Sequence, residues 1–195
     1  MVLHESKTPV EKLPKLAIRP YPTQYVGSWM AKDKATLTMR PIRPEDEPLL
    51  VKLHETLSDR TVTQRYFHPM QLSQRVAHER LARICFIDYD REIALVAERH
   101  DAKKGEREIW GVGRLSKSRS QEVAAFAVLV GDPYQGRGLG AEFLRRIVTV
   151  ARAVGVMKLV GRISADNERM RGLCKEMGFS FCDVGEHLIE ATLAL

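Results

Sequence analysis

A loop that contains three glycines, Gly136, Gly138 and Gly140, joins an apolar stretch to a segment with helical periodicity. Glycines leave the backbone accessible, and the first amides of a helix lie at the positive end of its dipole, so such a loop can bind phosphate groups. Gln135 and Arg137 add polar and charged side chains. Because the loop lacks the Lys-Ser or Lys-Thr pair of a P-loop and the spacing of a dinucleotide fingerprint, we expect an anion site of another kind.

The elements on either side of this loop can be predicted from their periodicity. Before the loop, residues 122–130 form a run that is apolar on both faces, which indicates a central strand. After it, apolar residues recur at helical spacing from Phe143 to Val154, and Gly155 ends the helix. The loop is therefore expected where a buried strand passes into a helix.

The remaining chain predicts a set of shorter elements. Expected helices cover residues 45–57, 73–84 and 167–177, and expected strands cover residues 36–40, 92–99, 109–116, 158–164, 179–183 and 188–193. This order indicates one α/β domain, with a mixed central β-sheet flanked by helices. The proline-rich residues 1–35 are expected to form an N-terminal extended arm, and residues 36–195 the domain.

Composition narrows the classes of function. The 31 Lys and Arg against 25 Asp and Glu give a net charge of +6. The sequence contains no long basic run and no helix that alternates basic and aromatic residues, so we expect no nucleic-acid partner. A small polyanionic ligand, an acidic protein partner or a merely solvated surface would account for the positive net charge. The longest apolar run has nine residues, against about 20 for a membrane span, so we expect no membrane contact. Without an apolar signal segment the expected location is cytoplasmic, and nothing in the sequence specifies an oligomeric state.

Three cysteines, Cys85, Cys174 and Cys182, are odd in number and far apart. No Cys-x-x-Cys pair or histidine cluster accompanies them, so we expect no metal site. They are predicted to be buried, reduced thiols.

The loop and the order of the elements resemble the GNAT superfamily of acyl-CoA-dependent N-acetyltransferases. Its pattern Gln/Arg-x-x-Gly-x-Gly/Ala matches Gln135, Gly138 and Gly140. Residues 18–22, 39–46, 87–92, 94–98 and 125–128 are similar to the GNAT domain of bacterial protein lysine acetyltransferases, which often follows a region similar to NDP-forming acyl-CoA synthetases. The resemblance covers residues 16–195 and implies a single GNAT-like domain.

By this resemblance the co-substrate is acetyl-CoA. Its pyrophosphate would bind the backbone amides of the loop, which consists of Gln135, Gly136, Arg137, Gly138, Leu139 and Gly140. Its pantetheine arm would pair with the edge of the central strand at Val128 and Val130, where free N–H and C=O groups match its amides. Asn167 occupies a position whose side chain commonly contacts the cofactor, and plain helix capping is an equal alternative.

The catalytic pattern of the relatives is broken at Ala125, where lysine acetyltransferases of this kind carry a glutamate. Because a lysine amine has a pKa of about 10.4, a general base usually assists its attack. Glu122 lies three residues away and faces the opposite side of a regular strand, so only a bulge would place it there. His68 and His187, on loops that line the acceptor groove in the superfamily, are the other candidate bases, although a loop histidine is often only solvated. The usual tyrosine acid is replaced by Cys174.

Two hypotheses follow. The first is an N-acetyltransferase that moves acetyl from acetyl-CoA to an amine, either a protein lysine or, as a weaker variant, a small amine. The second is a catalytically weak acetyl-CoA-binding sensor or regulatory module, which the alanine at position 125 favours.

Overall fold

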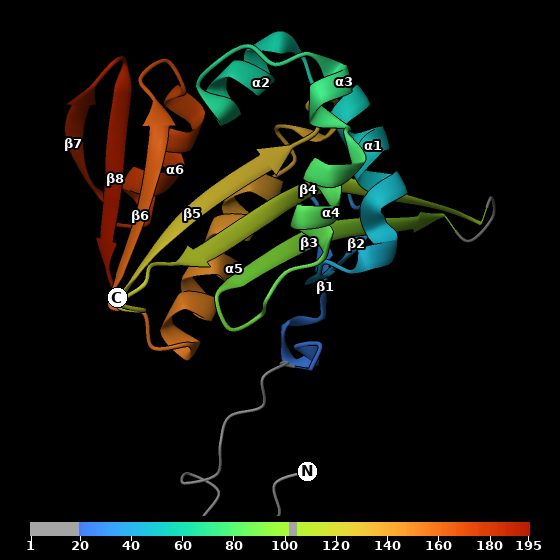
Figure 1. Cartoon of the computed structure of the whole chain (residues 1–195), viewed down its shortest axis with the longest axis horizontal. Coiled ribbons are helices and arrows are strands. Elements are labelled where there is room, and N and C mark those ends of the chain that lie inside the picture. The colour runs from blue at the N-terminus through green and yellow to red at the C-terminus, as the bar shows by residue number, and fades with distance from the viewer. Residues whose placement is uncertain (1–19, 102–104) are drawn as a thin grey trace, which may run out of the picture.

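The computed structural model describes residues 20–101 and 105–195. Within them the chain forms one eight-stranded sheet with the order β1-β2-β3-β4-β5-β6-β8-β7 (Figure 1). The strands are β1 (Gly27–Met30), β2 (Thr36–Pro41), β3 (Glu92–Asp101), β4 (Glu106–Lys117), β5 (Val123–Val130), β6 (Lys158–Ser164), β7 (Ser180–Gly185) and β8 (Leu188–Ala194). The helices are α1 (Glu47–Glu55), α2 (Asp59–Tyr66), α3 (Leu72–Arg75), α4 (His78–Cys85), α5 (Leu139–Ala153) and α6 (Glu168–Glu176), with the single turns η2 (Thr23–Tyr25), η3 (Pro44–Asp46) and η4 (Asp132–Tyr134).

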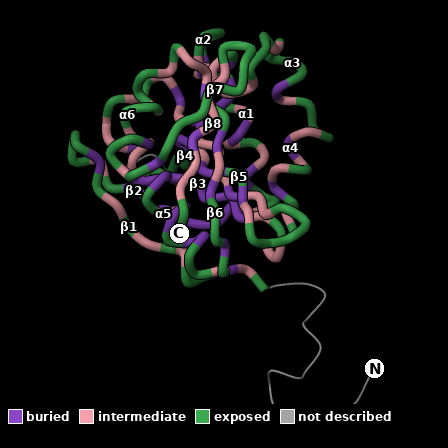
Figure 2. Tube along the Cα trace, turned by 90° about the vertical axis from the view of Figure 1, so that its left-hand side faces the viewer, coloured by how far each residue is buried: buried purple, intermediate pink, exposed green. Residues whose placement is uncertain are grey.

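Helices cover both faces of the sheet. Figure 1 shows α1 and α4 on one face and α5 on the other. Two buried clusters result, one between the sheet and α5 and a smaller one beneath α1 and α4. In Figure 2 the buried residues follow the central strands and α5. This arrangement confirms the expected α/β class and mixed sheet, and the described part of the chain contains no helix long and apolar enough to cross a membrane.

Small residues on β4 bring α5 close to the sheet. A Cβ atom on Gly113 would lie 2.6 Å from Cδ1 of Phe143, and one on Gly111 would lie 2.7 Å from the Leu129 carbonyl oxygen. Phe143 itself is fully buried. The two glycines therefore let the first turns of α5 pack directly on β4, which places the glycine loop at the end of β5.

The central pair β5 and β6 is the parallel pair of the sheet, and it separates along its length. Its register runs only from Val123 opposite Lys158 to Ala125 opposite Val160. Beyond that point residues 126–130 have β4 on one side and no described strand on the other, while β6 is paired with β8 along its whole length. The edge of β5 that faces β6 is thus open over its last five residues.

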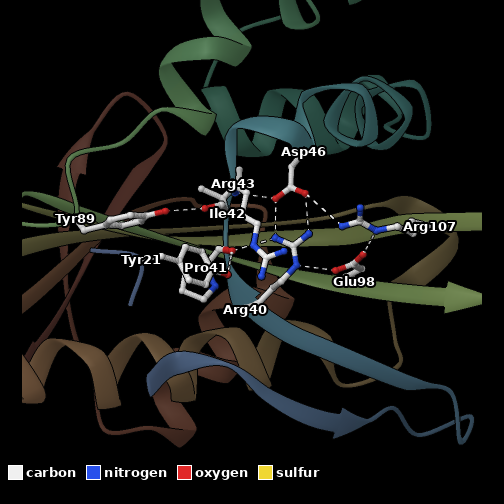
Figure 3. Close-up of polar contacts among 9 residues, drawn as sticks. All are labelled: Tyr21, Arg40, Pro41, Ile42, Arg43, Asp46, Tyr89, Glu98 and Arg107. Atoms are coloured by element: carbon white, nitrogen blue, oxygen red, sulfur yellow. Dashed lines mark hydrogen bonds and ion pairs between the residues drawn. The ribbon is translucent and has the colours of Figure 1, made fainter. Parts of the chain in front are cut away.

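An arginine network ties β2 to β3 and η3 (Figure 3). Both terminal nitrogens of Arg40 donate to Asp46 at 2.7 Å, and its Nε donates to Glu98 at 2.6 Å. Burial alone would lower the pKa of Arg40, but the hydrogen bonds to Asp46 and Glu98 raise it. Arg107 also pairs with Glu98. Two charged residues of the segment 39–46, Arg40 and Asp46, thus have a structural role in joining β2 to η3.

Four details differ from the sequence-based expectations. Residues 59–66 form α2, which we did not expect, and residues 73–84 form two helices, α3 and α4, instead of one. Residues 27–30, assigned to the arm, pair with β2 as an edge strand, and residues 1–19 of the expected arm lie outside the described residues. Cys85 and Cys174 are buried as expected, but Cys182 on β7 is exposed, because the edge strand that carries it is exposed along its whole length.

Candidate functional site

The glycine loop lies between β5 and α5, as predicted. Gly136 and Gly138 have φ angles of 77° and 91°, which glycine adopts without the strain that a side chain would cause. Gly138 is the N-cap of α5, so the first amides of that helix have no partner within it. Among the described residues, no backbone hydrogen bond takes the N–H of Gly136, Arg137 or Gly138. Several amide donors thus gather at the positive end of a 15-residue helix, which is the arrangement that binds an anion.

Gln135 connects the loop to its surroundings. Its Nε2 donates to Asp132 at 2.9 Å and to the Val130 carbonyl at 3.3 Å, and its Oε1 accepts from Arg169 of α6 at 3.2 Å. It therefore links the end of β5, η4 and α6 at the point where the loop begins. The hydrogen bonds of the Gln135 side chain thus stabilise the start of the loop.

Asp132 anchors α2 to the same place. Its carboxylate accepts from the Ser58 amide at 2.8 Å and from the Thr61 hydroxyl at 2.6 Å. Burial alone would raise the pKa of Asp132, but the hydrogen bonds from Ser58 and Thr61 outweigh it and lower that pKa. The carboxylate stays ionised and holds the start of α2 beside the loop.

The Arg137 side chain packs against the outer side of the loop. Its guanidinium lies over the ring of Trp110, 4.9 Å from the centroid, pairs with Asp33 and donates to the Pro133 carbonyl at 2.9 Å. Trp110 in turn stacks on Tyr134 with a centroid distance of 4.4 Å. The arginine therefore stiffens the loop and adds positive charge beside its amides.

Comparison with known proteins identifies the fold. The model of the "Acetyltransferase (GNAT) domain" matches residues 36–180. Acetyltransferase PA5475 of Pseudomonas aeruginosa is 31% identical over 147 residues, which are 75% of this chain and 76% of that protein. The chain belongs to the GNAT acetyltransferase family. It is an N-acetyltransferase by that membership, and acetyl-CoA is the co-substrate of the family.

One further curated protein is similar in sequence, and two solved structures share the fold. Acetyltransferase Pat of Mycolicibacterium smegmatis is 33% identical over 64 residues, which cover 33% of this chain and 19% of that protein. The GNAT domain of Streptomyces lividans PAT superposes with a TM-score of 0.79 at 23% identity, over 90% of this chain and all of that one. Salmonella typhimurium yncA, solved with its cofactor acetyl-CoA, gives a TM-score of 0.57 at 21% identity, over 82% of this chain and 94% of that one.

The candidate bases named from the sequence do not meet at β5. The register of β4 on β5 is continuous over residues 124–130, and Glu122 lies outside it, one residue before β5 begins. His68 follows the end of α2, and its Nδ1 lies 3.0 Å from the Pro69 carbonyl oxygen, while His187 lies in the β7–β8 turn, where its carbonyl accepts from the Ala165 amide. Both histidines are exposed.

Two further residues of the sequence argument have clear structural roles. Asn167 caps α6, and its Oδ1 accepts from the Met170 amide at 3.1 Å. Cys174 is fully buried, and that burial raises the pKa of its thiol to about 12. Cys174 therefore has a packing role in the core.

A row of side chains across three strands escaped the sequence analysis. Ser116 of β4 is paired with Ala125 on one side and with Glu92 of β3 on the other. Directly paired residues of antiparallel strands lie on the same face, so all three share the face covered by α4. The Ser116 hydroxyl donates to Glu92 at 2.6 Å, and Arg114 holds the same carboxylate. Glu92 and Arg114, which are charged residues next to the apolar stretches of β3 and β4, are the signal that sequence reading offers for this row.

Proposed function

We propose that this domain transfers the acetyl group of acetyl-CoA to a lysine side chain of a protein. The observation that carries the proposal is the meeting of the glycine loop, with its unpaired amides, and the open edge of β5 at residues 126–130. The likeness to Pat of M. smegmatis and to the GNAT domain of S. lividans PAT supports it. A small amine is the alternative acceptor.

The residues present fit acetyl-CoA. The loop from Gln135 to Gly140 would hold the pyrophosphate through its amides, since these donors have no internal acceptor and Gly138 leaves the approach free of a side chain. The open edge of β5 at Val128 and Val130 would pair with the pantetheine arm in the manner of an added strand. Asn167 is a further cofactor contact in this proposal, besides its capping of α6.

The chain's own groups suffice for the transfer itself. When bound, acetyl-CoA would supply a thioester whose carbonyl carbon the amine attacks and whose C–S bond breaks as coenzyme A leaves as its thiolate. Backbone N–H groups on the open edge of β5 polarise the carbonyl oxygen. Ser116, directly across from Ala125, accepts the proton from the amine and passes its own to Glu92. In this way a carboxylate two strands away, about 10 Å from the backbone of Ala125, takes the part of the missing glutamate.

The sensor hypothesis is the second candidate, and one observation favours it. Ala125 is exposed on the face where the acceptor would approach, so no carboxylate stands directly at that position. A domain that binds acetyl-CoA and turns over slowly, or not at all, would then report the acetyl-CoA concentration to a partner.

Titration calorimetry with acetyl-CoA, followed by turnover on a lysine peptide panel from pH 6 to pH 9, tests these assignments. The enzyme proposal expects binding and a rate that rises with pH, and binding without turnover on any amine would favour the sensor.

Ser116→Ala should lower kcat and shift its pH profile upward while acetyl-CoA affinity is kept. An unchanged pH profile in this variant would refute the relay through Ser116.

A further inference from the structure

An open cavity of about 400 Å³ lies between α4 and β4, on the face that carries Ala125. Arginines dominate its lining: Ala77, Glu79, Arg80, Arg83, Ile84 and Arg114 surround it. Arg114 is paired in the sheet with Ala127, two residues from Ala125, and paired residues of neighbouring strands are about 5 Å apart. The cavity therefore adjoins the part of β5 where the acyl group would lie.

The arginines beside this cavity have few counter-charges. Arg114 is bound by Glu92, but the described residues contain no ion pair from Arg65, Arg80 or Arg83 to a carboxylate, Glu79 included. The Nε of Arg80 is buried and has no hydrogen-bond partner. A buried N–H of a guanidinium normally has a hydrogen-bond acceptor. The arginines at this cavity therefore lack acceptor groups, which a bound anion would provide.

An aromatic side chain holds two of these cations in place. The guanidiniums of Arg80 and Arg65 lie 4.9 Å and 5.1 Å from the ring centroid of Tyr66 on α2. Burial, together with the charges of Arg114 and Arg80, lowers the pKa of Arg65. The positive charges of Arg65, Arg80 and Arg114 therefore repel one another. An anion bound beside them would reduce that repulsion.

The side chain of His54, which lies next to Tyr66, does not compensate the positive charges of these arginines. Its ring stacks on Tyr66 with a centroid distance of 6.5 Å, and its buried Nδ1 lacks a partner. Burial and the neighbouring arginines Arg75, Arg80 and Arg65 lower the pKa of His54 to about 4, so it is neutral near pH 7. His54 therefore adds no positive charge to the arginine cluster and supplies no negative charge either.

We propose that this arginine pocket binds an anionic group of the acceptor, a carboxylate or a phosphate, that lies close to the reacting amine. Arginine forks suit both groups because they donate two parallel hydrogen bonds. The pocket is one to two strand widths from Ala125, about 5–10 Å, and an extended peptide spans that distance in two or three residues. The preferred acceptor is accordingly a lysine with an acidic residue one to three positions away.

This inference rests on the acetyltransferase proposal only for the direction from which the acceptor enters. The main experiment uses fluorescent lysine peptides with glutamate, phosphoserine or glutamine two residues from the lysine, and measures their binding by anisotropy in the presence of coenzyme A. Because no turnover is needed, its outcome is separate from that of the enzyme proposal. The anionic peptides should bind roughly tenfold to a hundredfold more tightly than the glutamine peptide.

Substitutions show which arginines cause the preference for anionic peptides. Arg80→Gln and Arg83→Gln should each remove most of the charge preference, and the exposed side chain of Arg83 on α4 can be changed without disturbing the core. Arg152→Gln, on the exposed side of α5, is the matched control and should keep the preference. Equal binding of the charged and neutral peptides, or a preference that survives both pocket variants, would overturn the proposal.

A second arm separates protein acceptors from small ones. It compares two small amines of equal length, one ending in a carboxylate and one in an amide, as competitors of the glutamate peptide. If only the peptides show the charge preference, the acceptor is a protein. If the carboxylated amine competes as well, the pocket accepts small amino acids, and the inference of an anionic acceptor holds in both cases.

Discussion

The ring of Phe126 lies on the backbone of Gly161, where β5 and β6 separate. These are the first residues beyond the paired stretch in their two strands. The ring also packs edge-on against Phe179, with a centroid distance of 5.4 Å. A Cβ atom on Gly161 would overlap the Phe126 ring, so only glycine lets the aromatic side chain fill the space beneath the diverging strands. The contact thus lies at the point where the open edge of β5 begins.

Gly161→Ala should destabilise the domain by about 1–3 kcal/mol, because the added methyl group forces the Phe126 ring or β6 to move. Urea unfolding gives the value. Gly172→Ala is the control: Gly172 lies in α6, its Cβ would meet nothing within 4 Å, and alanine is the better helix former. Equal stability of the two variants would mean that the contact is not tight.

Gly138→Glu should weaken acetyl-CoA binding at least roughly a hundredfold, because it adds bulk and negative charge where the pyrophosphate is proposed. Calorimetry measures the change. Gly155→Glu is matched in backbone strain, since Gly155 has φ 76° against 91° for Gly138, but it lies at the other end of α5. That variant should bind acetyl-CoA normally. If Gly138→Glu does too, the loop is not the pyrophosphate site.

Ala125→Glu should raise kcat by roughly tenfold or more at neutral pH, because it places a carboxylate at the exposed position beside the open edge of β5. The comparison is Ala125→Gln, which has the same shape but cannot take up a proton. A steady-state pH series on one peptide decides between them. Should both variants behave like the parent, proton removal does not limit the rate.

Glu98 should make the domain sensitive to acid. Burial alone would raise its pKa, but the hydrogen bonds and charges of Arg107 and Arg40 lower it (Figure 3). A carboxyl group with a lower pKa in the folded state stabilises the fold above its unfolded pKa of about 4.3, and that stability is lost as the pH falls through the folded pKa.

The unfolding free energy should therefore decline below about pH 5, and the decline should be shallower in Glu98→Gln. Chemical denaturation at several pH values measures both slopes. The exposed Glu176 serves for comparison, and Glu176→Gln should leave the slope unchanged. A Glu98→Gln slope equal to that of the parent would show that the network does not control acid stability.

Much of the fold could be predicted because its signals are local. The apolar run before the loop, the three glycines and the stripe from Phe143 to Val154 each depend on neighbours within a few residues, and they correctly predicted β5, the loop and α5. The second helix was missed, although Ser58 as N-cap and the spacing of Val62 and Tyr66 were available, because α2 has eight residues and one buried side chain.

By itself, the sequence determined the family, the class of co-substrate and the place of the glycine loop, since these follow from residue types at short spacing. Tertiary structure decided which distant side chains meet. The register of three strands sets Glu92 and Ser116 in line with Ala125, and the packing of α2 and α4 gathers Arg65, Arg80 and Tyr66. Strand register and the packing of helices on the sheet depend on the free energy of the whole core. They therefore cannot be predicted from a local sequence pattern.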